Sequence, residues 1–280
     1  MRYASVFRPG LFDGQTVVVT GGGSGIGRAI AHELASLGAH VVVAGRKEPP
    51  LIAVVEEITA AGGSAFFKVC NIREEDSVQA LFADVLDARG QVDGLVNNAG
   101  GQFVSPAEAI SKNGWHAVIE TNLTGTFLMC REAYNRGMGA RGGAIVNIVS
   151  EMWRGFPGMA HSGAARAGVV NLTQTLAVEW AHANVRVNAV APGLIDSSGL
   201  ETYPEAMQAF IAQVVEDVPA KRMGTEAEVA AAVTYLLSPA AAYVSGETLR
   251  IDGAGSLWRK TWDIPSHPGP PPFPGFTEPR

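Results

Sequence analysis

Residues 16–27 read TVVVTGGGSGIG, an apolar run that leads directly into a cluster of glycines. Thr16 to Thr20 has the β-branched composition of a strand that is buried on both faces. The stretch Gly27 to Leu37, which follows the glycines, has the length and composition of a helix. A strand that turns through glycines into a helix is the first unit of a nucleotide-binding α/β sheet.

The glycine-rich turn predicts a site for a dinucleotide. Gly21, Gly25 and Gly27 have the spacing that allows a tight turn, close approach to a pyrophosphate and close helix packing. The helix N-terminus would present its free N–H groups to the anion. We therefore expect this turn, including Ser24 and Ile26, to contact the cofactor. The alternative, a glycine-rich loop that is only a turn, is disfavoured by its position between strand and helix.

The strand and helix pattern continues along the chain. Helix-length segments such as Asp76 to Ala88 separate the apolar runs. Six further runs are predicted as strands: His40 to Ala44, Ala65 to Val69, Gly94 to Asn97, Ala144 to Val149, Val185 to Val190 and Thr248 to Ile251. This repeat predicts an α/β fold, a single Rossmann domain whose doubly wound parallel sheet of about seven strands carries helices on both faces.

The composition changes near Lys260, where prolines become frequent and exclude regular helix or strand. We expect residues 1–259 to form the domain and residues 260–280 to form a Pro-rich C-terminal tail. The tail is either extended along a neighbouring surface or disordered.

Composition narrows the class of protein. The chain has 280 residues, of which 47% are hydrophobic and 17% charged, as in soluble globular domains. Its formal net charge of -6 argues against a general nucleic-acid partner, and no apolar run reaches membrane-spanning length. Cys70 and Cys130 lie far apart, so they predict buried free thiols in a reduced compartment rather than a metal site. Without a secretory signal, we expect a cytoplasmic protein.

The end of the second predicted strand indicates which dinucleotide binds. Sites for NAD usually carry Asp or Glu there, to accept the ribose hydroxyls. This sequence has Ala44 and Gly45 followed by Arg46 and Lys47, two cations that can pair with a 2′-phosphate. NADP(H) is therefore the preferred cofactor, with NAD(H) possible. The alternative is that the two cations only begin a solvated loop.

From Leu11 to Ser256 the chain resembles the short-chain dehydrogenases/reductases. The further motifs are Asn97-Asn98-Ala99-Gly100, Thr121-Asn122-Leu123-Thr124-Gly125, Pro192-Gly193 and Ile251-Asp252-Gly253, in the order in which that family has them. The resemblance implies cofactor contacts at Asn71, Ile72, Asn98, Ala99, Gly100, Pro192, Gly193, Ile195 and Ser197.

The catalytic region departs from the family's pattern. That family carries Tyr and Lys four residues apart on one helix face, where they donate a proton and hold the nicotinamide ribose. In this chain Ser162 and Arg166 stand at these positions, while Asn122 and Ser150 match the family's asparagine and upstream serine. Arg166 still offers several donors to the ribose hydroxyls. The usual acid is missing.

The missing tyrosine bears on the chemistry. Reduction of a ketone generates an alkoxide that needs a nearby acid, and a serine hydroxyl is a poor one. Reduction of a double bond conjugated to a thioester generates an enolate, which hydrogen-bond donors can stabilise. The altered site therefore favours enoyl reduction.

A closer resemblance, to the peroxisomal trans-2-enoyl-CoA reductases, points the same way. It rests on Cys70-Asn71-Ile72-Arg73, Gly100-Gly101-Gln102-Phe103, Ser105-Pro106-Ala107-Glu108 and His161-Ser162-Gly163-Ala164-Ala165-Arg166. It implies reduction of trans-2-enoyl-CoA thioesters with NADPH. Val170 and Gln174 stand where those reductases have a further Tyr and Lys, and Glu278-Pro279-Arg280 is no usual peroxisomal address.

Several other residues are candidates. His161, beside the substituted position, is either a proton donor or a helix-start residue that faces a partner subunit, and Glu151 is a weaker donor candidate. Residues that follow the fourth and fifth strands are predicted to line the substrate pocket: Gln102, Phe103, Met152 and Trp153. The amphipathic stretch Gly199 to Val218 is either a lid over the substrate or an ordinary surface helix.

The sequence thus predicts an NADPH-dependent oxidoreductase that acts on an acyl thioester, with no metal. Wide apolar faces on the helices around Asn122 and Arg166 predict a homo-oligomer, a dimer or tetramer, although deeper burial within one subunit explains them too. Two alternative functions remain open. One is a carbonyl or alcohol oxidoreductase such as a 3-ketoacyl reductase, and the other is a non-catalytic NADP(H)-binding sensor or scaffold.

Overall fold

Seven parallel strands form one sheet in the order β3-β2-β1-β4-β5-β6-β9. The structure is a computed structural model and describes residues 3–198, 211, 213–258 and 264–276. The strands are β1 (Thr16–Thr20), β2 (His40–Gly45), β3 (Ser64–Val69), β4 (Gly94–Asn97), β5 (Gly143–Ile148), β6 (Val185–Pro192) and β9 (Thr248–Ile251). The predicted doubly wound sheet of about seven strands is confirmed.

The central strands are apolar because both of their faces are covered. Every residue of β1 and β4 is buried. After β1 the chain moves outward to β2 and β3, and it then returns to place β4 on the other side of β1. The connections on the two sides of β1 therefore diverge, and they leave a crevice beyond the carboxyl ends of these strands.

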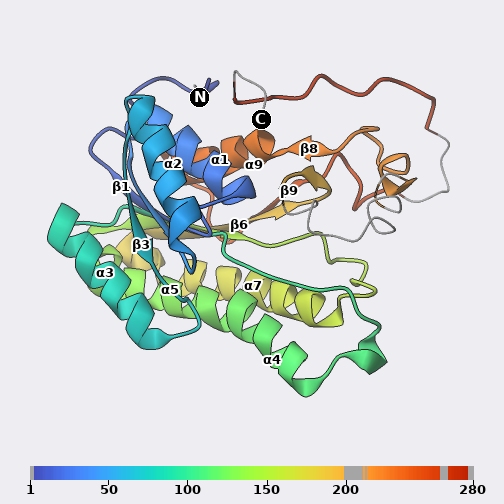
Figure 1. The fold of residues 1–280 in the computed structure, drawn as a ribbon, viewed down its shortest axis with the longest axis horizontal. Coiled ribbons are helices and arrows are strands. Elements are labelled where there is room, and N and C mark those ends of the chain that lie inside the picture. The colour runs from blue at the N-terminus through green and yellow to red at the C-terminus, as the bar shows by residue number, and fades with distance from the viewer. Residues whose placement is uncertain (1–2, 199–210, 212, 259–263, 277–280) are drawn as a thin grey trace.

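Helices cover both faces of the sheet (Figure 1). On one face α1, α2 and α9 pack over a core that contains Phe12, Ile30 and Leu236. On the other face α3, α5 and α7 pack over a second core, which contains Phe82, Met129 and Ile145. The helices are α1 (Gly25–Ser36), α2 (Glu48–Ala60), α3 (Glu75–Arg89), α4 (Lys112–Ile119), α5 (Gly125–Ala133), α6 (Gly139–Arg141), α7 (Ala160–Glu179) and α9 (Glu226–Leu237).

The apolar helix faces that predicted an oligomer are only partly buried within the subunit. Leu128, Val169 and Leu176 are buried within the subunit, as the alternative explanation required. Phe127 on α5 remains 39% exposed and Val178 on α7 remains 79% exposed. Part of this apolar surface is therefore open to solvent.

A small parallel pair of strands, β7 (Ile195–Asp196) and β8 (Gly224–Thr225), stands beside the main sheet. It brackets the predicted lid, most of which, with Met207 and Phe210, lies outside the described residues. Thr225 then starts α9 with a capping box, because its hydroxyl accepts from the Glu228 amide and the Glu228 carboxylate accepts from the Thr225 amide.

The described part of the tail, residues 264–276, lies along the domain (Figure 1). His267 Nε2 donates to the carbonyl of Pro219 (2.9 Å), and Arg222 Nε donates to the carbonyl of Pro270 (2.9 Å). Thr225 Oγ1 donates to the carbonyl of Phe273 (2.7 Å). The tail thus binds the segment between the predicted lid and α9.

The tail then meets the N-terminal segment over α1. Tyr3 and Phe276 form an antiparallel bridge, and their rings meet edge to face at 4.9 Å between centroids. The Arg28 guanidinium of α1 lies 4.7 Å from the centre of the Phe276 ring. Both ends of the described chain are therefore held on the same helix. None of the described helices combines the length and the apolar character that crossing a membrane requires.

Gly269 should be required for docking of the tail. Its φ of +76° is left-handed, and an added Cβ would lie 2.4 Å from the carbonyl oxygen of Ala220. Gly62 also has a positive φ (+85°) but faces open space, so it is a matched control. We expect each Gly→Ala change to cost about 1–2 kcal/mol of unfolding free energy. Only Gly269→Ala should also speed hydrogen exchange at the Phe273 amide; equal exchange in both variants would contradict the tail contact.

Candidate active site

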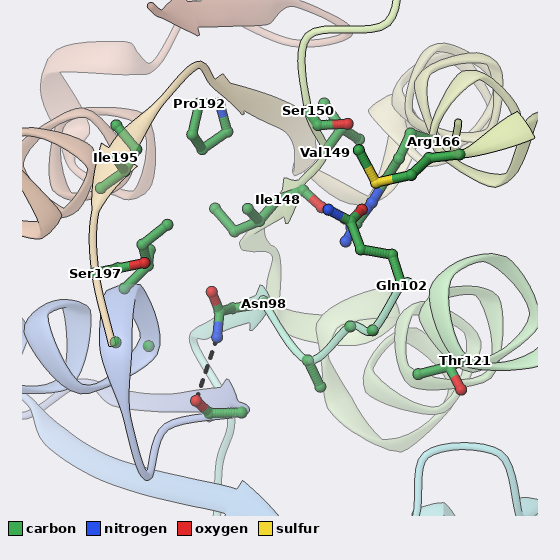
Figure 2. Close-up of a pocket in the computed structure, with 18 of the residues that line it drawn as sticks. Asn98, Gln102, Thr121, Ile148, Val149, Ser150, Arg166, Pro192, Ile195 and Ser197 are labelled. Carbon is green, nitrogen blue, oxygen red and sulfur yellow. Dashed lines mark hydrogen bonds between the residues drawn. The ribbon is translucent and has the colours of Figure 1, made fainter. Parts of the chain in front are cut away.

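A cleft of about 820 Å³ opens at the carboxyl ends of the sheet strands. Its lining comes from the turns that follow β1, β2, β4, β5 and β6 and from the start of α1. This is the crevice between β1 and β4 where open α/β sheets bind their ligands. Figure 2 shows Gln102, Ser150 and Arg166 gathered on one side, across from Ile195 and Ser197.

Most of the residues predicted to contact the cofactor come together in this cleft. Those that line it are Gly21, Ser24, Gly25, Ile26, Gly27, Arg46, Asn71, Ile72, Asn98, Ala99, Gly100, Arg166, Pro192, Gly193, Ile195 and Ser197. Lys47, which caps the start of α2, is not among the described lining residues.

The glycine-rich turn has the backbone that the sequence predicted. Gly21 and Gly25 have φ values of +64° and +56°, which side-chain-bearing residues rarely adopt. A Cβ on Gly27 would lie 2.2 Å from the carbonyl oxygen of Gly21. Ser24 precedes α1, and its side chain makes no capping hydrogen bond. The first amides of the helix are thus open to an anion in the cleft.

Thr20, which the sequence reasoning missed, ties this turn to the end of β4. Its Oγ1 accepts from the backbone amides of Asn98 (3.0 Å) and Ala99 (3.0 Å) and donates to the carbonyl of Val96 (3.2 Å). Asn98 Nδ2 returns a hydrogen bond to the carbonyl of Thr20 (3.0 Å) and also donates to the carbonyl of Gly21 (3.3 Å; Figure 2). A polar residue at the last position of an otherwise apolar strand was the available signal.

The second strand brings a positive charge to the cleft. Arg46 follows β2, is exposed and lines the cleft, and Ala44 and Gly45 before it carry no acid. Across from it Arg73 also lines the cleft, but its Nη2 is paired with Glu120 Oε2 at 2.6 Å. Arg46 is therefore the better placed of the two for an additional phosphate.

Asn122 acts as a clamp inside the fold. It lies in a π-helical turn (Glu120–Thr124) between α4 and α5, and such turns are often found at functional sites. Its Nδ2 donates to the carbonyls of Gly101 (2.7 Å) and Val118 (2.9 Å), and its Oδ1 accepts from the Gly101 amide (3.2 Å). It therefore holds the loop that leads to Gln102.

Arg166 places a positive charge deep in the site. Its Nη1 donates to the carbonyl of Ile148 (2.6 Å), while its buried Nε has no hydrogen-bond partner. No described carboxylate forms an ion pair with it. Burial lowers the pKa of this guanidinium to about 10, so it remains charged at neutral pH. Gly100 leaves the necessary room, because a Cβ there would lie 2.6 Å from Arg166 Nη2.

Ser162 is fully buried, and its hydroxyl donates to Gln102 Oε1 at 2.7 Å. It thus holds the Gln102 side chain, which lines the cleft, although the two residues are 60 positions apart. Ser150 also lines the cleft, and its buried Oγ has no described partner. The two hydroxyls therefore differ: one donates a hydrogen bond within the protein, and the other is buried without a described partner.

His161 is fully buried beside Ser162. Its Nδ1 accepts from the Ser162 amide (2.8 Å), and its ring packs edge to face on Phe103 with 4.3 Å between centroids. It is not among the described residues that line the cleft. This placement favours a residue that supports the start of α7 over a proton donor.

Of the four predicted pocket residues only Gln102 lines the cleft among the residues described. Phe103 covers His161, and the Trp153 ring packs against the Arg250 guanidinium at 4.3 Å. Met152, like Trp153, is displaced from the cleft by the turn after β5. The sequence reasoning missed several apolar residues that do line it: Val104, Phe156, Pro157, Met159 and Leu194. Ile211 and Val214, from the stretch Gly199 to Val218 considered as a lid, also line it.

Comparison with known proteins covers most of the chain. A family model described as Enoyl-(Acyl carrier protein) reductase matches residues 21–255. A probable 2,4-dienoyl-CoA reductase of Bacillus subtilis (strain 168), named as producing (2E)-enoyl-CoA, is 39% identical over 243 residues, which are 85% of this chain and 95% of that protein.

Two solved structures share the fold. Citronellol catabolism dehydrogenase of Pseudomonas aeruginosa PAO1 is 56% identical with a TM-score of 0.83, and the match covers 91% of this chain and 100% of that one. A protein of Beutenbergia cavernae described as a putative NAD(P)-dependent gluconate 5-dehydrogenase, with NADP bound at low occupancy, is 37% identical with a TM-score of 0.82, and the match covers 89% of this chain and 99% of that one. The relatives agree on oxidoreductase chemistry and differ in substrate.

Replacement of Asn122 by Asp should loosen the clamp. The change removes the two N–H donors to Gly101 and Val118 and turns carboxylate oxygens toward their carbonyls. We expect a loss of about 2–4 kcal/mol in the free energy of unfolding, measured by urea denaturation. Asn113→Asp, on an exposed position of α4, is the control and should change stability by less than about 0.5 kcal/mol. Similar losses in both variants would show that the clamp contributes nothing.

Proposed function

The chain belongs to the short-chain dehydrogenase/reductase family, and we propose that it uses NADPH to reduce a carbon–carbon double bond conjugated to a thioester, as in trans-2-enoyl-CoA. The proposal rests on one observation above all. The Ser162 hydroxyl, at the position of the family's tyrosine, is used to hold Gln102. The dienoyl-CoA reductase of B. subtilis, which shares 39% of its residues, supports the same class of substrate.

The cleft fits a nicotinamide dinucleotide. A Cβ on Gly27 would clash with the Gly21 carbonyl, so α1 packs closely on the glycine-rich turn, and the open amides at the start of α1 can receive a pyrophosphate in the cleft. Arg46 would pair with the 2′-phosphate of NADPH, and Arg166 would bond the ribose hydroxyls in place of the family's lysine. When bound, NADPH supplies a hydride. The NADP in the gluconate 5-dehydrogenase neighbour is consistent with this choice.

The protein's own groups suit an enolate better than an alkoxide. Hydride addition to the β-carbon leaves charge on the thioester oxygen, and that charge needs donors rather than an immediate acid. The Ser150 hydroxyl lines the cleft without a described partner, and the charged Arg166 lies in the same region (Figure 2). Ser162 fixes the orientation of the Gln102 amide through Oε1. These groups can polarise a thioester carbonyl before hydride arrives.

A carbonyl or alcohol oxidoreductase is the second candidate. The name of the Pseudomonas neighbour, a dehydrogenase of citronellol catabolism that is 56% identical, favours it. Such chemistry needs an acid for the alkoxide oxygen. Neither Ser162, bound to Gln102, nor His161, outside the lining, is placed to supply one.

We also propose that the protein is a homo-oligomer. Trp115 on α4 and Phe127 on α5 are each 39% exposed, and Val178 on α7 is 79% exposed. These helices share one side of the molecule (Figure 1), so the three side chains mark a surface that a second copy can cover.

The substrate class can be tested by NADPH oxidation with trans-2-enoyl-CoA and 3-ketoacyl-CoA in parallel. We expect turnover with the enoyl substrate. Ser162→Ala should lower kcat/KM about fivefold, the cost of one neutral hydrogen bond that orients Gln102. Arg166→Ala should abolish turnover, while Arg166→Lys, which restores the family's residue, should retain part of it.

Turnover of the 3-ketoacyl substrate alone would overturn the enoyl proposal and favour the second candidate. Tight NADPH binding without turnover of either substrate would favour the non-catalytic alternative.

The cofactor preference depends on Arg46. Arg46→Glu should raise the dissociation constant for NADPH by about 10–100-fold, since a charge-assisted bond contributes about 1.5–3 kcal/mol. Binding of NADH, which lacks the 2′-phosphate, should change little. Lys47→Glu is the matched control, because Lys47 carries the same charge outside the cleft. Fluorescence titration measures both cofactors; equal weakening of NADPH and NADH by Arg46→Glu would refute the assignment.

A further inference from the structure

Double-bond reduction also needs a proton for the α-carbon, and the cleft contains few groups that can give one. The titratable side chains among its described lining residues are Arg46, Cys70, Arg73, Glu151 and Arg166. Glu151 is the only carboxyl in this set. It follows Ser150 directly, at the carboxyl end of β5, and lines the same cleft as the proposed thioester donors.

The other candidate donors are poorly placed. Ser162 Oγ gives its proton to Gln102, and His161 lies outside the lining with its ring against Phe103. Cys70 lines the cleft at the far end, beside Asn71, and burial raises the pKa of its thiol. The arginines carry guanidinium groups, which suit the binding of anions and oxygen atoms rather than the transfer of a proton to carbon.

The surroundings of Glu151 favour its protonated form. The carboxyl is partly buried, and Asp252 follows β9, which lies two strands from β5 in the sheet. Burial first, and then the Asp252 charge, raise the pKa of Glu151, while Arg154 and Arg250 oppose this shift. Both cations have other partners: Arg154 donates to the Trp258 carbonyl (2.5 Å), and Arg250 stacks on Trp153.

The loop after β9 also leaves room at this carboxyl. A Cβ on Gly255 would lie 3.7 Å from Glu151 Oε2, so this loop passes close to the carboxyl. None of the ion pairs among the described residues includes Glu151. Asp252 itself is fixed in place, because its carboxylate accepts from the amides of Ala254 (2.9 Å) and Ser256 (3.1 Å).

We propose that Glu151 is the general acid that protonates the α-carbon of the substrate, in the role left vacant by the family's tyrosine. This inference rests on the proposed reduction of an enoyl thioester. The hydride supplied by NADPH forms the new C–H bond at the β-carbon, and the electrons of the double bond move to the thioester oxygen. The enolate electrons then form the α-carbon–hydrogen bond as the O–H bond of Glu151 breaks. The carboxylate recovers its proton from water at the mouth of the cleft.

The decisive variant is Glu151→Gln, which keeps the size of the side chain and removes its acid. We expect kcat for trans-2-enoyl-CoA to fall about 10²–10⁴-fold, with NADPH affinity unchanged. The wild-type rate should fall as the pH rises through the pKa of Glu151, because the protonated form is the active one, and this alkaline limb should vanish in the variant. Glu108→Gln, an exposed residue, is the matched control and should leave rate and pH profile unchanged.

A second variant tests the same group through its neighbour. Asp252→Asn removes the negative charge that raises the pKa of Glu151, so the alkaline limb should move to lower pH. In deuterated water, the wild type should label the α-carbon on one face, as NMR of the product would show. Glu151→Gln should label both faces, because free water would protonate the enolate.

The outcomes separate the two proposals. Suppose that the wild type turns over the enoyl substrate and that Glu151→Gln has the same rate, pH limb and α-carbon stereochemistry. This result would overturn the role of Glu151 alone. No turnover by the wild type would overturn the proposed function and this inference together.

Discussion

Thr20 Oγ1 accepts the backbone amides of both Asn98 and Ala99, and the geometry of the whole cleft depends on this contact. It joins the end of β1 to the end of β4, the two strands between which the chain changes direction across the sheet. The glycine-rich turn leaves one of these strands and the loop to Gln102 leaves the other. Any shift between them would separate the cofactor cradle from the groups proposed to act on substrate.

The same cleft combines an unpaired positive charge with a carboxyl group that has no ion-pair partner. Arg166 keeps its charge without a described carboxylate partner, and Glu151 stands near Asp252 without an ion pair. Unpaired charges in a partly desolvated site are costly to folding, and they are common where a protein binds or transforms a ligand. The exchange of Tyr and Lys for Ser and Arg therefore does not leave the site without polar function. It moves the acidic group from the helix α7 to the end of a strand.

The sequence was sufficient for the parts of the fold that have a local signal. The apolar runs predicted all seven sheet strands to within about two residues, and the signal is strongest for strands such as β1 and β4, which are buried on both faces. Contacts between distant residues could not be predicted in this way. Nothing in the spacing shows that Ser162 bonds Gln102, or that Trp153 turns away from the cleft to meet Arg250. The Pro-rich composition was likewise compatible with either an extended, docked tail or a disordered one. The hydrogen bonds of the tail with Pro219 and Arg222 show that its described part is docked.

The antiparallel bridge between Tyr3 and Phe276 makes the described polypeptide nearly a closed ring. If the two ends were joined and the chain were opened elsewhere, the elements would keep their order around the sheet. The contacts that build the cleft therefore do not depend on where the chain starts. A short linker across this bridge would allow circular permutation at an exposed turn such as the one at Gly62, on the way from α2 to β3. Added domains at either end would emerge together over α1, on the opposite side of the sheet from α5 and α7 (Figure 1). They would leave that second surface open for assembly.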